Sequence, residues 1–138
     1  MEIENKNHKE YHSSSHLLYS CQYHVIFCPK YRRDVLKDGV DERIKELFPK
    51  IAKKYNFEIL EMEVMPDHIH LLIDCNPRFG IVNCIKRLKA ESTAPLRNEF
   101  PTLKKRLPCL WTRNSFISTV GSVSLETVMK YIENQKNV

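Results

Sequence analysis

The sequence predicts an α+β fold, in which an antiparallel sheet carries helices on one face and a further helix follows the last strand. Three observations support this class. Four stretches show the two-residue alternation of strands, two stretches between them show helical spacing, and a short proline-aspartate turn joins two strands directly. The order strand, helix, strand, strand, helix, strand is typical of ferredoxin-like/RRM-like domains, which leave one face of the sheet open for a ligand or a partner.

Length, charge and cysteine content limit the class of protein. A chain of 138 residues is the usual size of one domain, and we expect a flexible polar tail over residues 1–15 and a single domain over 16–138. The net charge of +5 suits a nucleic-acid partner only if the basic residues cluster. Five cysteines without a C-x-x-C pair indicate neither a disulfide framework nor a zinc knuckle. With no long apolar run and no signal peptide, we expect a cytoplasmic protein without a membrane partner.

The first predicted strand alternates cleanly. Within residues 19–27, Val25 and Phe27 lie on the predicted core face, and His24 and Ile26 lie on the opposite face. The remaining predicted strands are residues 57–64, 68–74 and 114–121, with the second and third of the four joined as an antiparallel hairpin.

Helical spacing predicts the other elements. Residues 41–55 form an amphipathic pattern, in which Pro49 should kink or divide the helix. Residues 79–93 form the second such pattern, and Pro95 argues against its unbroken continuation. The basic triplet 104–106 is expected in a solvated loop. The last helix is predicted over residues 124–136.

The strand 68–74 carries two histidines on its predicted open face. Because side chains alternate, His68 and His70 point away from the core residues Ile69 and Leu71. Their Cα atoms should lie roughly 6.5–7 Å apart, close enough for two imidazoles to converge on one divalent ion. A polar strand face also carries histidines that have no task, so the pair alone leaves metal binding open. A metal site needs at least one further ligand.

The last helix offers such a ligand. At about 100° per residue, Tyr131 and Gln135 lie one turn apart, on the flank of an apolar stripe. A tyrosine in that place need not belong to the core, although a packing role remains open. The predicted stripe consists of Leu125, Val128, Met129 and Ile132.

Four motifs together resemble a known family. KYRRDVL, EMEVMPDHIHLLI, WTRNSFISTVGSVS and YIENQ occur in this order. They resemble the TnpA-type single-tyrosine transposases, the IS200-like transposase family of the HUH endonuclease superfamily. The resemblance covers about residues 17–136. A His-x-His pair alone would be weak evidence, but a His-x-His strand followed by a terminal Tyr-x-x-x-Gln helix is specific.

The resemblance implies a role for each motif residue. His68 and His70 would hold Mg²⁺ or Mn²⁺, Gln135 would complete the protein ligands, and Tyr131 would be the nucleophile. The enzyme would cleave and rejoin single-stranded DNA at insertion-element ends through a 5′-phosphotyrosine intermediate, without ATP, and would recognise DNA hairpins. It would act as a homodimer, in which the tyrosine helix of one subunit can complete the metal site of the other.

Basic residues near the motifs are candidates for phosphate contacts, with Tyr31 or Phe79 as stacking partners for bases. The triplet around Tyr31 is the best of these clusters, and each isolated lysine or arginine is equally well explained as a solvated charge. The DNA-binding candidates are Lys30, Tyr31, Arg32, Arg33, Lys86, Arg87, Lys89 and Arg97.

Two other interpretations compete with strand transfer, and one variant of strand transfer also stays open. A catalytically idle module could bind hairpins on the same sheet without cutting them. A hydrolase of the histidine-triad kind would need a third alternating histidine, and position 72 is Leu. A domesticated, repeat-associated transposase would differ from the enzyme of a mobile element only in the flanking DNA.

Overall fold

A four-stranded antiparallel sheet in the order β4-β5-β3-β6 organises the molecule. The computed structural model describes residues 12–14, 17–19, 21–120 and 125–137. The strand order and directions are those of the predicted ferredoxin-like sheet, which confirms the α+β fold class. The strands are β3 (Gln22–Phe27), β4 (Glu58–Met65), β5 (His68–Asp74) and β6 (Phe116–Thr119).

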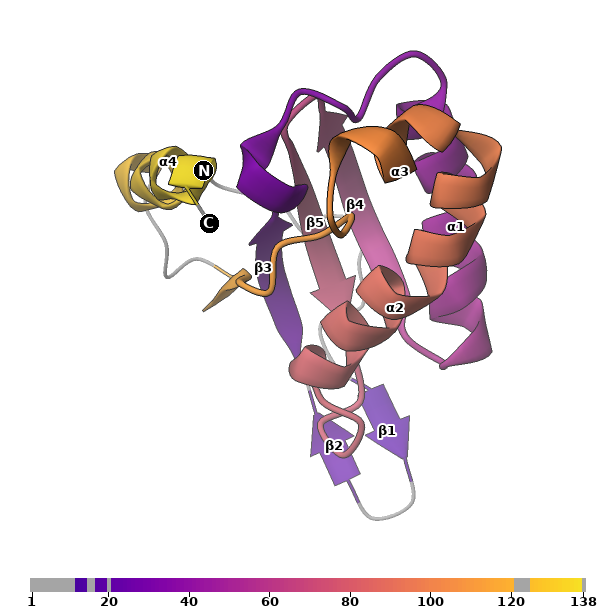
Figure 1. Ribbon diagram of the computed structural model, residues 1–138. Coiled ribbons are helices and arrows are strands. Elements are labelled where there is room, and N and C mark those ends of the chain that lie inside the picture. Colours follow the sequence, from indigo (N-terminus) through magenta and orange to yellow (C-terminus); the bar gives the residue numbers. More distant parts are fainter. Residues whose placement is uncertain (1–11, 15–16, 20, 121–124, 138) are drawn as a thin grey trace.

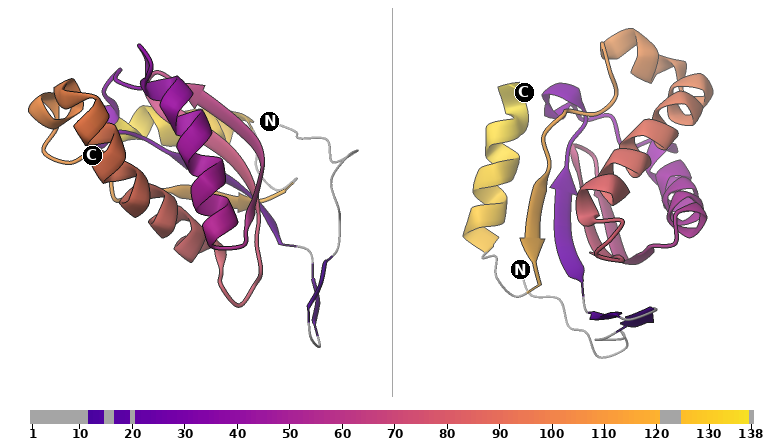
Figure 2. Two further views of the ribbon diagram at one scale, coloured as in Figure 1. Left: turned by 90° about the vertical axis from the view of Figure 1, so that its right-hand side faces the viewer. Right: turned by 90° about the horizontal axis from the view of Figure 1, so that it is seen from below.

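Helices lie on both faces of this sheet, in three layers (Figure 1). Helices α1 and α2 cover one face, and α4 lies along β3 and β6 on the other face, as the view from below in Figure 2 shows. The face predicted to be open is therefore partly covered by the chain's own last helix. The helical elements are η1 (Lys30–Arg32), α1 (Val40–Lys54), α2 (Ile81–Glu99), α3 (Pro101–Arg106), α4 (Leu125–Asn134) and η2 (Gln135–Asn137).

The main core fills the space between the sheet and the helices α1 and α2. Strand β5 contributes Ile69 and Leu71, as its alternation predicted, and β3 contributes Val25 and Phe27. The Phe27 ring meets the indole of Trp111 edge to face, with ring centroids 5.1 Å apart. This well-packed side of the sheet fixes β5, so the opposite side chains of β5 are held in defined positions on the other face.

Strand β4 differs from the prediction at one residue. The ladder with β5 shifts register between Ile59 and Glu61, so Leu60 is an extra residue on the β4 side. A bulge of this kind moves the following side chains to the other face. Ile59 therefore packs on the same core as Met62, although strict alternation placed these two residues on opposite faces.

Both prolines expected to interrupt helices lie inside unbroken ones. Pro49 lies within α1, and Pro95 lies within α2, which runs on to Glu99. A proline inside a helix costs about 3 kcal/mol because it removes a hydrogen bond and crowds the preceding turn. Burial of Leu96 directly after Pro95 offsets that cost, since this side chain is completely enclosed by the core.

Two peripheral segments also differ from expectation. His12–Ser14, expected within the flexible tail, forms strand β1 and pairs with β2 (Leu17–Tyr19), whereas residues 1–11 and 15 lie outside the described residues. The triplet 104–106, expected in a loop, ends helix α3, which anchors itself by burying Leu103. Within the described part of the chain, no helix has the length and apolar character needed to span a membrane.

Candidate active site

The predicted histidine pair lies on the sheet face that α4 covers. His70 is almost fully buried, and its ring stacks on that of His24 from β3, with centroids 5.6 Å apart and an interplanar angle of 8°. Burial, with His24 and His68 nearby, lowers the pKa of His70 to about 4. The imidazole of His70 is therefore neutral near pH 7, which is the form that binds a metal ion.

His68 is oriented by its neighbour in the chain. Its Nδ1 lies 2.8 Å from Oδ1 of Asp67. A carboxylate only accepts hydrogen bonds, so Nδ1 carries the proton, and in the neutral ring Nε2 keeps its lone pair for a ligand. A carboxylate behind a ligating histidine is the usual arrangement that fixes ring orientation at metal sites.

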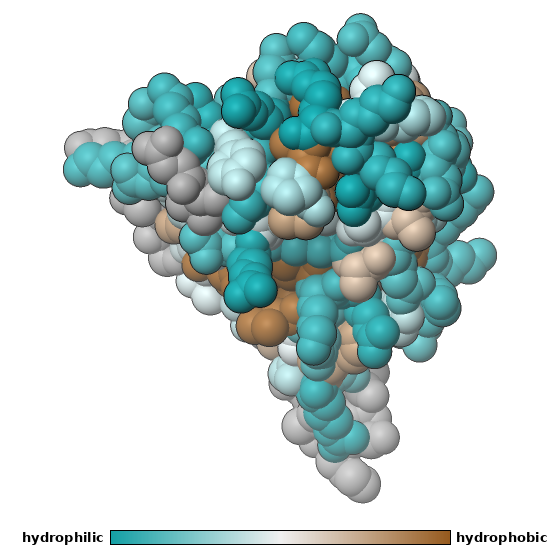
Figure 3. Space-filling view, viewed as in Figure 1, coloured by the Kyte–Doolittle hydropathy of each residue, from teal (hydrophilic) through white to brown (hydrophobic). Residues whose placement is uncertain are grey.

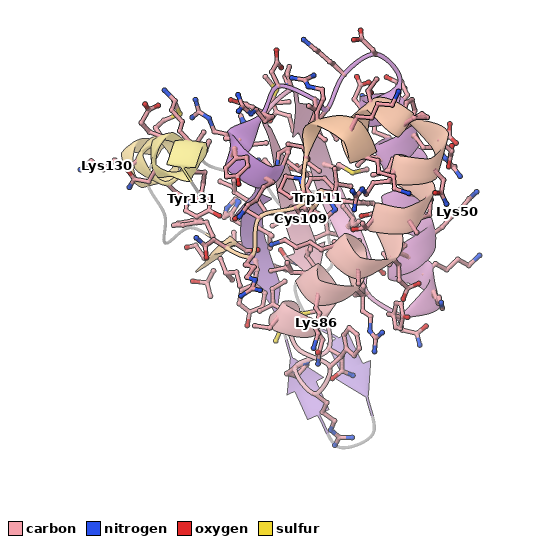
Figure 4. All side chains as sticks on the ribbon, viewed as in Figure 1. Lys50, Lys86, Cys109, Trp111, Lys130 and Tyr131 are labelled. Carbon is pink, nitrogen blue, oxygen red and sulfur yellow. The ribbon has the colours of Figure 1, made fainter. Side chains whose placement is uncertain are left out.

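Tyr131 points from α4 towards the sheet, whereas its neighbour Lys130 points away from it (Figure 4). The ring of Tyr131 packs against Phe116 of β6, with centroids 5.3 Å apart, and beside the buried Ile26 and Ile132. Burial is the main cause that raises the pKa of the Tyr131 hydroxyl, while the backbone of Phe116 acts in the opposite direction. The phenol is thus protonated and enclosed in this arrangement.

The predicted apolar stripe of α4 is confirmed at Ile132, which is buried against the sheet, and is wrong at Met129; the side chains of Leu125 and Val128 lie outside the described part of the chain. Met129 is 56% exposed, whereas Tyr131, Ile132 and Gln135 are turned inwards. Hydrophobic periodicity alone misplaced Met129, because the sheet beneath α4 presents both apolar and polar side chains and contacts Tyr131 as well as Ile132.

Buried polar atoms without hydrogen-bond partners gather on this face. Such atoms are normally paired, since leaving one unpaired costs about 1–3 kcal/mol. Within the described residues, they include both ring nitrogens of His24, Nε2 of His70, the Tyr131 hydroxyl and Oε1 of Gln135.

These donors fit a divalent metal ion. Nε2 of His68 and Nε2 of His70 would supply two imidazole ligands, and the unpaired Oε1 of Gln135 would supply an amide oxygen. Among the residues that the structure describes, no group of three or more His, Cys, Asp or Glu side chains is arranged to hold a metal ion. Gln135 stays the expected third protein ligand, and its unpaired amide oxygen is compatible with that role.

Two residues of this site were not singled out from the sequence. Asp67 stands directly before His68, and His24 shares the alternation of β3 with Ile26. Adjacency could have suggested Asp67, because a carboxylate next to a ligating histidine is a common partner. His24 became visible only when the register of β3 and β5 brought its ring against His70.

Lys89 is not available as the predicted phosphate contact. Its Nζ donates to the carbonyl oxygens of Thr112 and Asn114, at 2.9 and 3.0 Å, and to the hydroxyl of Ser115 at 2.8 Å. Burial lowers the pKa of Lys89 to about 8. This lysine instead holds the turn that leads into β6.

Other basic candidates divide into inward and outward groups. Arg32 makes contacts within the chain, and Arg97 approaches the carbonyl of Leu107 at 3.5 Å. Arg87 lies over the Tyr55 ring, 4.9 Å from its centroid. Phe79, the other predicted stacking residue, instead packs between core aromatic rings. The exposed candidates are Tyr31, Arg33, Lys86 and Arg87, and Lys30 is half-buried.

An apolar groove of about 510 Å³ runs between α2 and the segment 109–117. Figure 3 shows apolar surface in the hollow on this side of the molecule, with polar side chains around it. Lys86 and Arg113 lie at its rim, and Trp111 forms part of its wall. This groove lies on the side of the sheet opposite His70, so it is separate from the histidine and tyrosine site.

Sequence comparison connects these residues with known proteins. The ISDra2 transposase TnpA of Deinococcus radiodurans is 38% identical over 120 residues, which cover 86% of each chain. The transposase for insertion sequence element IS200 of Salmonella typhimurium is 31% identical over 125 residues, covering 89% of this chain and 82% of the relative.

Structural comparison agrees. A crystal structure of a candidate transposase from Deinococcus radiodurans R1 has a TM-score of 0.84 and 32% identity, and covers 92% of this chain and 99% of the other. A REP-associated tyrosine transposase bound to a REP hairpin shares the fold, with a TM-score of 0.54 at 13% identity, over 88% of this chain and 69% of the other. The family model described as "Transposase IS200 like" matches residues 17–135, and the chain belongs to that family of DNA-cleaving transposases.

Proposed function

We propose that this protein cleaves and rejoins single-stranded DNA at the ends of an insertion element, with Tyr131 as the nucleophile. The observation that carries the proposal is the set of unpaired, buried polar atoms on the α4 face of the sheet. Tyr131, His70 and Gln135 each leave such an atom there. Unpaired groups of this kind cluster where a substrate or an ion completes their coordination.

Tyr131 would attack the scissile phosphate in line with the departing 3′-oxygen. The bond from the phenolic oxygen to phosphorus forms, the bond from phosphorus to the 3′-oxygen breaks, and the 3′-oxygen takes up a proton as the phenol loses one. The products are a 5′-phosphotyrosine and a free 3′-hydroxyl. A second 3′-hydroxyl reverses the same steps on another strand, so the bond energy is conserved and no ATP is needed.

The metal site would consist of His68, His70 and Gln135. A bound Mg²⁺ or Mn²⁺ supplies charge withdrawal from the phosphate oxygens, which favours attack by a neutral or partly ionised nucleophile. The chain's own contribution is orientation. Asp67 sets the tautomer of His68, and the His24 ring limits the rotation of His70.

The proposed substrate is a single strand bearing a hairpin. The related tyrosine transposase with the same fold was solved with a hairpin bound. Here Tyr31 is 41% exposed beside Lys30 and Arg33, which offers a base-stacking surface next to positive charge. These residues lie in the segment between β3 and α1. Arg32 of the same segment contacts Asp67 of the candidate active site.

We also propose a homodimer joined through β6. Both β4 and β6 are edge strands, but they differ in character. Strand β4 carries three glutamates, a common protection against pairing with another chain, whereas β6 carries no charge. Ile117 of β6 and Val82 of α2 are exposed, and both line the apolar groove. A second copy added at this edge would cover both.

The test is covalent capture. The protein is incubated with a labelled single-stranded hairpin and Mn²⁺, and the protein-DNA adduct is measured on a denaturing gel. We expect an adduct with the wild type and its loss, by about a thousandfold or more, in Tyr131→Phe, because the nucleophilic oxygen is absent. His68→Ala should lower adduct formation strongly at limiting Mn²⁺.

Tyr23→Phe is the matched control, since Tyr23 lies on the opposite face of β3 against the main core. It should form the adduct as the wild type does. An adduct that persists in Tyr131→Phe would refute the assignment of the nucleophile. Hairpin binding by the wild type without any adduct would instead favour the catalytically idle module.

A further inference from the structure

Arg32 occupies a strained and largely enclosed place. The backbone of Tyr31 and Arg32 has φ values of 60° and 49°, in the left-handed region that residues with side chains rarely adopt. Such conformations cost of order 1–3 kcal/mol each and persist only where other contacts require them. They turn Tyr31 outwards, while the Arg32 side chain is only 15% exposed. The strain indicates that the contacts of the Arg32 side chain hold the backbone in this conformation.

The Arg32 guanidinium connects two elements far apart in sequence. Its Nε lies 3.2 Å from Oδ2 of Asp67, as an ion pair without the angle of a linear hydrogen bond. Its Nη1 donates to the carbonyl oxygen of Ile132 at 2.9 Å and lies 3.6 Å from Oε2 of Glu133. The other oxygen of Asp67 contacts His68. One side chain thus links the metal-ligand strand to the residues that follow Tyr131.

The contact on α4 falls where a helix needs it. The last four carbonyl groups of a helix lack partners within it, and the carbonyl of Ile132 is one of them, since α4 ends at Asn134. A cation near these groups also interacts favourably with the helix dipole. The last turn of α4 has no basic residue of its own. Arg32 supplies that charge from another part of the chain.

We propose that Arg32 is a positioning residue that docks the tyrosine helix on the sheet and, through Asp67, holds the ring of His68. This inference rests on the proposed function for the roles of Tyr131 and His68, and it replaces the expected DNA-phosphate role of Arg32. A lysine is a poor substitute, because a single ammonium group lacks the planar fork that reaches a carboxylate and a carbonyl together.

Amide hydrogen exchange of the free protein, without DNA or metal, tests the docking. An isolated helix of 10 residues is marginal in water, so undocking exposes the amides of α4. We expect Arg32→Gln to speed exchange in residues 129–136 about tenfold, the scale of one lost charge-assisted hydrogen bond, and to leave α1 and α2 unchanged. Arg32→Lys should restore only part of the protection.

Arg33→Gln is the matched control for charge, because Arg33 is adjacent and exposed. It should leave α4 exchange at the wild-type rate. Equal exchange in Arg32→Gln and wild type would overturn the proposal. Faster exchange spread equally over α1, α2 and α4 would also overturn it, since the arginine would then stabilise the whole domain.

Nitrogen chemical shifts of the His68 ring give a second readout that general destabilisation does not move. In the wild type, the proton should lie on Nδ1. Asp67→Asn and Arg32→Gln should both raise the population with the proton on Nε2, because the carboxylate is absent or no longer held. An unchanged tautomer in both variants would remove His68 from the proposal.

The two proposals fail separately. If wild-type protein forms the DNA adduct but α4 exchange ignores Arg32, the positioning role is wrong and the transposase chemistry stands. If α4 exchange responds as expected but no adduct forms with any hairpin and Mn²⁺, the helix is docked by Arg32 and the chemistry is wrong.

Discussion

The two faces of the sheet differ in the side chains that they bury. On the α1 and α2 face, Phe27, Leu71 and Leu88 are completely buried in a continuous apolar cluster. On the α4 face, the buried apolar cluster among the described residues consists of Ile26 and Ile132, with Phe116 and Tyr131 packed beside them. The same face holds His24, His70, Tyr131 and Gln135, each of which has a buried polar atom without a partner in the described residues.

This difference separates stability from chemistry. Burial of side chains on the apolar face offsets the loss of conformational entropy on folding, and these side chains have no other role in the proposed mechanism. The α4 face tolerates unpaired groups because the first face already holds the strands in place. Polar groups kept unpaired in a rigid setting are ready to bind a charged ligand without first giving up other partners.

The largest effect should come from neighbouring leucines of β5 that point to opposite faces. Leu71 and Leu72 are both fully buried. We expect Leu71→Ala to lower the free energy of unfolding by about 3–4 kcal/mol and Leu72→Ala by about 2 kcal/mol, because only the first opens a cavity in the main core. Urea unfolding measures both. Equal losses would mean that the α4 face contributes as much stability as the core.

A smaller effect is expected from pH. The pKa of His70 is about 4 in the folded protein and 6.5 when unperturbed, so the unfolded chain binds the proton first as the pH falls. Stability from the neutral ring is complete above about pH 6.5 and is lost towards pH 4, at up to about 1.4 kcal/mol per pH unit. His70→Gln should flatten this dependence in metal-free urea titrations.

His24 also contributes to the pH dependence of stability, because burial lowers its pKa as well. Some slope should therefore remain in His70→Gln, and His24→Phe combined with it should remove most of the remainder. Stability that is flat across this pH range in the wild type would contradict the buried, neutral state of both rings.

The smallest effect is expected from His24→Phe alone. The substitution keeps a ring against His70 and removes two buried nitrogens that lack partners. We expect the free energy of unfolding to rise by about 1 kcal/mol, since the cost of the unpaired groups disappears. Thermal unfolding measures the change at neutral pH. A clear loss of stability would show that these nitrogens have a partner in solution.

Alternation and spacing correctly predicted the order of strands and helices in the sheet domain. The period of β5 correctly separated Ile69, Leu71 and Ile73 from His68 and His70, because a strand allows only two directions for its side chains. The same rule failed in β4, where the bulge at Leu60 changed the count. Helical spacing was right for Ile132 of α4 and wrong for Met129, because the sheet beneath the helix contacts Tyr131 instead.

The sequence by itself determined the strand and helix order, the His-x-His pair and the tyrosine-glutamine spacing, because these depend on neighbours within a few residues. Only the tertiary structure decided which basic residues remain available for DNA. Lys89 and Arg32 are the same residue types as Lys86 and Arg33 and lie in the same segments of the sequence. In the structure, however, Lys89 and Arg32 donate to carbonyl groups distant in the chain. Long side chains find such partners through folding, and no local pattern records the distance.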